Sequence, residues 1–382
     1  MLYYNKQSIS DIDIRYVSRA LKKNILTRGQ LNVEFEKNIC EKTKSNYSVS
    51  FNSASSALTA ACFALGLKKD DLVWTVPNTF VSTASCALHF SAKIDFVDID
   101  NKYKIMCVDK LEEKLIRSEK IKKLPKILIP VHYAGQATNQ EKIFKLSKKY
   151  GFKVLEDASH SFGGMRDSEP VGSCKWSDIV VSSFHPVKTI TTGEGGVACT
   201  NSKELDFRLK IYRNNGIIRD YRFLKKKTKE IFYYEQQYLG HNFHLPDINA
   251  ALGISQLKRL KKFINKRKKI FNYYNKNINN KNLILPSIDK KNNSTHHLYV
   301  CNLKDGIDRK KVLSYFYKNK ITLNVLYIPV HLHPIYYKKG FRKGDYPNSE
   351  WHYNTSVALP IYYDLSKKNL DKIVNLLNKI KI

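Results

Sequence analysis

Long apolar runs and paired cysteines are both absent from this sequence of 382 residues. No uninterrupted apolar segment approaches the ~20 residues that a membrane-spanning helix needs, so we expect no membrane contact. The first residues, Met1-Leu-Tyr-Tyr-Asn-Lys6, also lack the apolar stretch of a signal peptide. The seven cysteines are odd in number, scattered and without a C-x-x-C motif. They predict reduced thiols in a cytoplasmic protein that has no disulfide framework and no metal site.

Acidic side chains are scarce as well, because 34 Asp and Glu face 66 Lys and Arg, giving a formal net charge of +32. Such a surface is compatible with nucleic acid, an anionic membrane or a phosphorylated substrate. The lysines are spread along the whole chain and accompany an excess of Asn, Ile and Tyr, which favours a codon bias over a functional patch. Charge alone therefore selects no function, and a nucleic-acid-binding protein on an inactive enzyme fold stays open as an alternative.

Apolar strands and amphipathic helices alternate along the chain, whose length suits about two domains. Ser10 and Asp13 resemble the capped start of a first helix. Further helices are predicted at 52–65, 79–89 and 140–150, and strands at 47–51, 72–76, 94–97, 126–131, 153–155, 178–183 and 197–200. This alternation predicts an α/β fold whose mostly parallel sheet is covered on both faces. A change of composition then divides the chain into a large domain, residues 1–256, and a smaller C-terminal domain, residues 257–382.

Lys188 lies in a loop rich in Ser, Thr and Gly, within Ser182-Ser-Phe-His-Pro-Val-Lys-Thr-Ile-Thr-Thr-Gly-Glu-Gly-Gly196. About thirty residues upstream, a predicted strand leads into Glu156-Asp-Ala-Ser-His160. Pyridoxal phosphate chemistry needs a lysine that forms a Schiff base and a carboxylate that keeps the pyridine nitrogen protonated. Lys188 and Asp157 supply both groups in this order, each after an apolar strand. Together they predict a pyridoxal-phosphate enzyme, although Asp157 taken alone could simply cap the next segment.

Other candidate residues also follow strands, where ligands of such sheets bind. Residues 53–56 open a helix, and the free backbone N–H groups of a helix start suit the cofactor phosphate, although an ordinary helix can begin in the same way. Ser183 could reach that phosphate or merely end its strand. Phe80 could stack on the cofactor ring or belong to the core. His160 and His185, each taken singly, are more often structural than catalytic.

Seven motifs carry a resemblance to a known family. They are Asn52-Ser-Ala-Ser-Ser-Ala-Leu58, Pro77-Asn-Thr-Phe-Val-Ser-Thr-Ala84, Glu156-Asp-Ala-Ser-His160, Ser183-Phe-His-Pro-Val-Lys188 with Gly193-Glu-Gly-Gly196, Gly240-His-Asn-Phe-His-Leu-Pro246, Tyr327-Ile-Pro-Val-His331 and Leu359-Pro-Ile-Tyr362. Across nearly the whole chain the sequence resembles the DegT/StrS-type nucleotide-sugar aminotransferases. The resemblance implies the α/β fold type I of pyridoxal-phosphate-dependent aminotransferases (aspartate aminotransferase-like). That fold has a large, mostly parallel sheet domain and a smaller C-terminal α+β domain. The resemblance also implies pyridoxal 5'-phosphate as cofactor and a homodimer with its active site at the interface, with no nucleic acid partner.

The resemblance also implies roles for single residues. Lys188 would be the Schiff-base lysine and the proton carrier, Asp157 the partner of the pyridinium, and His160 a neighbour of the ring hydroxyl. The implied cofactor-binding set is Ala54, Ser55, Phe80, Asp157, His160, Ser183, Lys188 and Asn242, the last reaching in from the partner subunit. The sugar-nucleotide pocket would be lined by Tyr4, Asn24, Ile25, Leu26, Thr27, Val325, Leu326 and Tyr327, with Arg28 as a candidate contact for the diphosphate.

Within the family, the resemblance is greatest to the transaminases on the route to pseudaminic acid, through Ser159-His160, Ser183-Phe-His185 and Gly240-His-Asn242. It implies amination of the fourth carbon of a UDP-linked 2-acetamido-2,6-dideoxy-hexos-4-ulose, with L-glutamate as amino donor. Ile25 and Leu326 replace polar residues of those enzymes, so a GDP- or dTDP-linked keto-deoxy sugar stays an alternative substrate. A dehydratase of the same family is disfavoured, because those relatives carry His where this chain has Lys188.

Overall fold

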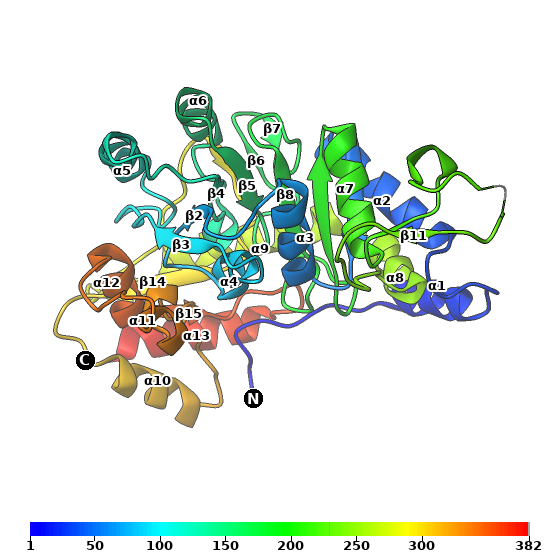
Figure 1. Ribbon diagram of the computed structural model, residues 1–382. Helices are drawn as coiled ribbons and strands as arrows, with labels where there is room; N and C mark the ends of the chain where they lie inside the picture. The colour runs from blue at the N-terminus through cyan, green and yellow to red at the C-terminus, as the bar shows by residue number, and fades with distance from the viewer. Residues whose placement is uncertain (229, 381–382) are drawn as a thin grey trace.

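A seven-stranded sheet forms the centre of the computed structural model, which describes residues 1–228 and 230–380 (Figure 1). Its strands, in spatial order, are β1 (Tyr47–Phe51), β9 (Gly196–Thr200), β8 (Ile179–Ser183), β5 (Lys153–Asp157), β4 (Ile127–Ile129), β2 (Leu72–Thr75) and β3 (Lys93–Phe96). Strand β9 runs antiparallel to both of its neighbours, and every other pair in this sheet is parallel. The predicted α/β class and mostly parallel sheet are therefore confirmed.

Helices cover both faces of this sheet, which explains why its strands read as nearly continuous apolar runs. On one face, α3 (Ala54–Ala64), α4 (Ser82–Leu88) and α7 (Lys203–Arg213) share a core with the sheet. On the other face lie α2 (Gln30–Thr43), α5 (Val108–Lys120), α6 (Gln140–Tyr150) and α8 (Asp247–Leu257). Neighbouring strand residues point to opposite faces, so Val73 joins the first core while Trp74 joins the core under α5 and α6.

The observed helix ends follow the predicted ones, with small shifts that have local causes. Helix α1 (Asp11–Leu21) begins after Ser10, whose backbone N–H donates to Asp13 Oδ2 at 2.8 Å. Helix α4 begins at Ser82 and not at Thr79, because a turn in which the Thr79 N–H binds the Pro77 carbonyl precedes it. Helices α2, α5, α7 and α8 were not predicted from the sequence.

A second, antiparallel sheet lies in the C-terminal part of the chain, with strand order β12 (Leu283–Ile284), β14 (Tyr299–Leu303) and β15 (Ser356–Leu359). Helices α10 (Arg309–Lys318) and α13 (Lys367–Lys379) pack on it. Helix α9 (Leu260–Asn277) belongs to both parts, because Phe263 packs in the core of the large sheet and Tyr274 in that of the small sheet. The division at residue 256 stays a prediction.

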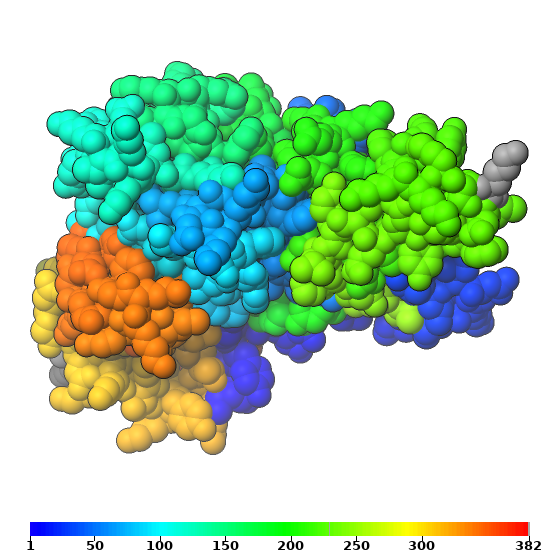
Figure 2. Space-filling model, viewed as in Figure 1, coloured from blue at the N-terminus to red at the C-terminus, as the bar shows by residue number. Residues whose placement is uncertain are grey.

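The remaining elements are short, and several of them connect the two parts. They are η1 (Tyr133–Gly135), β6 (Met165–Arg166), β7 (Glu169–Pro170), β10 (Ile217–Ile218), η2 (Tyr221–Phe223), β11 (Glu235–Gln236), β13 (Asn292–Asn293), η3 (Val330–Leu332), α11 (Pro334–Tyr337) and α12 (Pro347–Thr355). Val330 and Tyr336 return from the C-terminal part to the large core, where Tyr336 meets Phe96 edge to face. Figure 2 shows this return, with the orange segment lying against the blue and cyan first half of the chain.

The N-terminal segment runs beside the small sheet before α1 begins (Figure 1). Leu2 bridges Ile321, and the Ile361 N–H donates to the Tyr4 carbonyl. All seven cysteines are free. Across residues 1–228 and 230–380, no helix combines the length and the apolar character needed to cross a membrane. The same residues contain no cluster of three or more His, Cys, Asp or Glu that could hold a metal ion.

Candidate active site

A cavity of about 740 Å³ opens at the carboxyl ends of β1, β5 and β8. Its lining consists of Tyr4, Asn52, Ser53, Ala54, Ser55, Ser56, Thr79, Phe80, Ser82, Val131, Asp157, Ser159, His160, Ser183, His185, Val187, Lys188, Glu194, Leu326 and Tyr327. The structure thus brings together residues that follow five strands, β1, β2, β4, β5 and β8, as expected for a ligand site of an open α/β sheet. Seven of the eight expected cofactor residues lie here, and Asn242 does not.

Asp157 is the last residue of β5 and is held by hydrogen bonds to both carboxylate oxygens. The Thr83 hydroxyl donates to its Oδ2 at 2.7 Å, and the Ser159 backbone N–H donates to its Oδ1 at 3.0 Å. The side chain is buried, at 5% exposure, yet it lines the cavity. Its position is therefore fixed by its surroundings, which suits a carboxylate that must meet one ligand atom.

Lys188 lies in a loop that leaves β8 and returns to β9. The Phe184 N–H donates to the Gly195 carbonyl at 2.9 Å and the Thr192 N–H to the Phe184 carbonyl at 3.0 Å, so the loop is closed at its base. Burial of the amine lowers the pKa of Lys188 to about 8, and the negative charge of Asp157 opposes part of this shift. The amine is consequently neutral far more often than that of a solvated lysine.

The start of α3 also lines the cavity. Ser53 caps this helix, and its hydroxyl accepts the Ser56 N–H at 3.1 Å. The backbone N–H groups of Ala54 and Ser55 have no intrahelical partner at this position, and the helix dipole adds positive potential. Gly196 lets the helix approach the sheet so closely, since a Cβ there would lie 2.5 Å from the Ala54 nitrogen.

His160 and Tyr327 both line the cavity and are hydrogen-bonded to each other, in a way that defines the tautomer of His160. Its Nδ1 accepts the Ala134 N–H at 3.3 Å, which leaves the proton of a neutral ring on Nε2, 3.0 Å from the Tyr327 hydroxyl. Burial, with a smaller contribution from the charge of Lys188, holds the pKa of His160 well below its usual value. The Nε2–H therefore donates to the Tyr327 oxygen, and the phenol keeps its own proton for a group in the cavity.

Three further side chains shape the cavity where a substrate could enter. Phe80 is 54% exposed and its ring lies 6.1 Å from that of Tyr327, so it is available for stacking and is not part of the core. Leu326 contributes a mostly buried apolar wall, and its carbonyl accepts the Tyr133 hydroxyl at 2.5 Å. His185 lies at the rim with Nε2 3.8 Å from Glu194 Oε1.

Several expected substrate residues do not line this cavity. Val325 precedes the lining residue Leu326 but is not part of the lining. Residues 24–28, which include Arg28, also lie outside the cavity. Thr27 instead bridges Pro246, and the Asp247 N–H donates to the Leu26 carbonyl. Asn242 bridges Asn214 in the same region. Residues 24–28 and 242–247, here called the rim segments, thus contact one another without lining the cavity, although the Phe243 carbonyl accepts the N–H of the lining residue Asn52.

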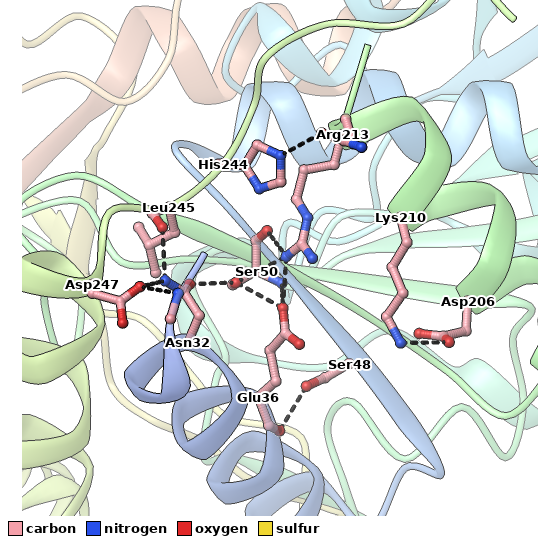
Figure 3. Close-up of polar contacts among 12 residues, drawn as sticks. Asn32, Glu36, Ser48, Ser50, Asp206, Lys210, Arg213, His244, Leu245 and Asp247 are labelled. Atoms are coloured by element: carbon pink, nitrogen blue, oxygen red, sulfur yellow. Dashed lines mark hydrogen bonds and ion pairs between the residues drawn. The ribbon is translucent and has the colours of Figure 1, made fainter. Parts of the chain in front are cut away.

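A polar network beneath the rim segments fixes their positions (Figure 3). Asp247 accepts the N–H groups of Gly29 and Leu31, and also the Asn32 side-chain amide. The Asn32 Oδ1 lies 3.0 Å from the Ser50 hydroxyl oxygen. A Cβ at Gly29 would meet Asp247 Oδ2 at 2.4 Å, so this contact requires glycine. One buried carboxylate therefore joins the start of α2 to the start of α8.

The other half of this network is an ion pair between Glu36 of α2 and Arg213 of α7, next to Ser50 of β1 (Figure 3). Arg213 Nη1 lies 2.6 Å from Glu36 Oε1, and the Ser50 hydroxyl donates to the same carboxylate oxygen at 2.8 Å. His244 lies nearby, and burial together with the charges of Arg213 and Arg28 lowers its pKa to about 4. It is therefore a neutral ring beside two cations.

Sequence reasoning missed Thr83 and Thr79 as functional candidates. The two hydroxyl oxygens are 2.8 Å apart, and Thr83 binds Asp157. Both belong to the motif Pro77-Asn-Thr-Phe-Val-Ser-Thr-Ala84, which had supplied Phe80 alone. In the sequence they appear only as two threonines four residues apart after a strand, a pattern that is common where a buried helix begins.

Comparisons with known proteins agree with this geometry. Residues 7–378 match the DegT/DnrJ/EryC1/StrS aminotransferase family. A UDP-4-amino-4,6-dideoxy-N-acetyl-beta-L-altrosamine transaminase of Campylobacter jejuni subsp. jejuni serotype O:2 is 34% identical over 397 residues, covering 100% of this chain and 99% of the relative. An uncharacterized protein, MJ1066 of Methanocaldococcus jannaschii, is 35% identical and covers 97% of this chain and 95% of its own length.

Among solved structures, PseC of Helicobacter pylori, an aminotransferase involved in pseudoaminic acid biosynthesis, superposes with a TM-score of 0.88. It is 28% identical, and the match covers 98% of both chains. The fold and the cavity define a pyridoxal-phosphate-dependent aminotransferase of fold type I. The chain belongs to the DegT/DnrJ/EryC1/StrS family and is a sugar aminotransferase.

Proposed function

We propose that this aminotransferase moves the amino group of L-glutamate to the fourth carbon of a UDP-linked 2-acetamido-2,6-dideoxy-hexos-4-ulose. The observation that carries the chemistry is the meeting of Lys188 and Asp157 in one cavity of about 740 Å³. The similarity to the transaminase of Campylobacter jejuni and to the structure of Helicobacter pylori PseC supports the choice of sugar. The cavity volume lies in the usual range of small-molecule sites, about 300–1,000 Å³.

The residues present fit the cofactor at each of its three functional groups. Asp157 can hold the protonated ring nitrogen, Lys188 can take the aldehyde, and the start of α3 with Ser183 can bind the phosphate. Bound pyridoxal phosphate supplies an electron sink for the charge that develops on the carbon losing its proton. Phe80 is free to cover one face of the ring, because its side chain is exposed to the cavity.

Lys188 is the proton carrier of this proposal. Its Nζ takes the α-proton of the amino donor in the first half of the reaction and returns a proton to the sugar carbon in the second. A pKa of about 8 suits both tasks, because a base works best when its pKa lies near the working pH. Burial provides this pKa, so the lysine needs no cationic neighbour to activate it.

Tyr327 and His160 would orient the sugar. The His160 Nε2–H donates to the Tyr327 oxygen, so the phenol proton can point to a keto or hydroxyl oxygen of the substrate. Burial raises the pKa of Tyr327 well above its usual value, which keeps that proton in place at neutral pH. Tyr4, on the N-terminal segment, borders the same cavity.

A dimer would complete the site, with each subunit's rim segments placed at the cavity of its partner. The proposal is supported by the position of Asn242 and residues 24–28, which lie together but do not line the cavity of their own chain. The neighbouring segments 217–228 and 230–239 project at the right of Figure 1, and the second exposes the large apolar side chains Ile231, Phe232 and Leu239. Exposed apolar groups on a projecting segment are typical of a surface that another chain covers.

Complementation tests the shared site. Lys188→Ala and Asn242→Ala chains should each be inactive alone, whereas a mixed dimer holds one site that lacks both residues and one that keeps both. Random mixing of equal amounts gives about half mixed dimers, so about a quarter of the sites should be active in a two-fold dimer. Absence of recovery in isolated mixed dimers would show that Asn242 acts within its own subunit.

Mass spectrometry on a panel of sugars tests the substrate. UDP-, GDP- and dTDP-linked 4-keto-6-deoxy sugars are each incubated with the enzyme and L-glutamate, with L-aspartate as an alternative donor. The UDP-acetamido sugar should gain an amine at the highest rate. Far faster amination of a GDP- or dTDP-linked sugar would overturn the substrate and leave the aminotransferase assignment intact.

A further inference from the structure

Thr83 behaves unlike the other buried threonines within helices. In α2 and α3, the hydroxyls of Thr43 and Thr59 donate to the carbonyls of Ile39 and Ser55, four residues earlier, at 2.9 and 3.0 Å. This is the ordinary arrangement for a threonine in a helix. The Thr83 side chain is fully buried in α4, but its hydroxyl leaves the helix and donates to Asp157 Oδ2 at 2.7 Å.

Thr79 fixes the direction of that hydrogen bond. The Thr79 and Thr83 oxygens are 2.8 Å apart, and both side chains are nearly inaccessible to solvent. A hydroxyl has one proton to give, and Thr83 gives its proton to the carboxylate. Thr79 must therefore donate to Thr83, so the two hydroxyls form a chain with one direction that ends at Asp157.

We propose that Thr83 is a positioning residue for the cofactor, and that its hydroxyl, oriented by Thr79, holds the Asp157 carboxylate toward the ring nitrogen. The Ser159 N–H restrains the other oxygen, so the two donors together fix the carboxylate plane. Donors to a carboxylate also stabilise its charged form, which is the form that keeps a pyridinium protonated. Thr83 acts only through Asp157, since it does not line the cavity.

The same short segment carries Phe80, which borders the cavity beside Thr79. The start of α4 would therefore support the cofactor in two ways. The Phe80 ring can stack on the face of the cofactor ring, and the Thr79 and Thr83 hydroxyls act on its nitrogen through Asp157. A displacement of this segment would alter both contacts together. Thr83 thus connects the placement of α4 to the electronic state of the cofactor.

The test compares three variants by cofactor binding and by the visible spectrum, without any sugar. Thr83→Val keeps the shape and removes the donor, so the dissociation constant for pyridoxal phosphate should rise about tenfold, as expected for a hydrogen bond to a charged group. The pH midpoint of the absorption band of lysine-bound cofactor should shift upward. When the ring nitrogen of the cofactor is protonated less often, the ring withdraws less electron density from the Lys188 nitrogen that is bound to it. That Lys188 nitrogen then keeps its own proton to higher pH. Thr83→Ser keeps the donor and should stay within about twofold of the parent in affinity, with an unchanged midpoint.

Thr75→Val is the matched control. Thr75 is equally buried and donates to the Ile129 carbonyl at 2.8 Å, so this variant loses a buried hydroxyl that has no contact with Asp157. Asp157→Asn removes the carboxylate charge altogether and so gives the largest shift of the pH midpoint that can be expected. Equal affinity and midpoint in Thr83→Val and Thr75→Val would overturn the proposal, whereas a midpoint unmoved by Asp157→Asn would overturn the role of Asp157 itself. Should Thr83→Val fail to fold, Thr79→Val must show a smaller shift in the same direction.

Discussion

The pKa of Lys188 offers a direct test of the site, because it can be measured without cofactor or sugar. Burial lowers this pKa from the usual 10.5 to about 8, and the charge of Asp157 limits the shift. At about pH 7.5, roughly a quarter of such an amine is neutral, against about one in a thousand for an ordinary lysine. The expected gain in neutral amine is therefore about two hundredfold.

Arylation by a neutral reagent such as dinitrofluorobenzene measures this fraction, since only the neutral amine reacts. Peptide mass spectrometry of the cofactor-free protein, pulsed between about pH 6 and 11, gives a rate at each lysine. Exposed lysines of the same chain serve as the internal reference. The rate at Lys188 should rise with a midpoint near 8 and level off before the exposed lysines begin to react.

The variant Asp157→Asn tests whether the charge of Asp157 raises or lowers the pKa of Lys188. The carboxylate favours the charged amine, so its removal should move the Lys188 midpoint further down. A midpoint above about 10 in the parent protein would refute burial as the cause of activation. A midpoint that rises in Asp157→Asn would show that the two groups do not interact in the manner the structure describes.

Three other substitutions test separate parts of the molecule. Lys188→Ala should abolish turnover while circular dichroism stays unchanged, because the lost amine is both anchor and proton carrier; more than trace activity would contradict its role. Gly196→Ala places a Cβ 2.5 Å from the Ala54 nitrogen and should weaken phosphate binding, measurable as a lower affinity for pyridoxal phosphate; unchanged affinity would mean that α3 need not lie so close. Asp247→Ala leaves the Gly29 and Leu31 N–H groups unpaired, removes one acceptor of the Asn32 amide, and should lower the free energy of unfolding by about 3 kcal/mol, measured by urea titration against the parent; a loss below about 0.5 kcal/mol would show that water replaces the carboxylate.

The strands and the residues that follow them could be predicted from sequence because the chain alternates strictly in this region. Strands β5 and β8 are buried on nearly their whole length and read as apolar runs, and Asp157 and Ser183 stand at the ends of these runs. The carboxyl ends of parallel strands share one edge of the sheet, which brings these residues together without knowledge of strand order. That reasoning needed only local pattern.

Thr83 and the network under the rim segments could not be found in this way. Thr83 meets Asp157 across 74 residues, and Asp247 meets Asn32 across 215 residues. A buried threonine and a carboxylate at a helix start each have ordinary local explanations, so their partners become visible only after the chain is folded. Helix α2 was missed for a related reason: it begins beside Gly29, in a contact with Asp247 that no local pattern signals.

The two apolar residues that set this chain apart from the pseudaminic-pathway pattern would act on a substrate from different directions. Leu326 is 9% exposed and borders the cavity that holds Lys188, with its backbone fixed through the Tyr133 hydroxyl. Ile25 is 58% exposed and lies on the rim segments, so in the proposed dimer it would meet the substrate bound by the partner. An apolar exchange in a pocket changes discrimination by only about 1–3 kcal/mol. In the proposed dimer, Leu326 would therefore contact the sugar near the reacting carbon, whereas Ile25 would contact the part of the substrate that extends toward the second subunit, and the two effects would add only in the assembled dimer.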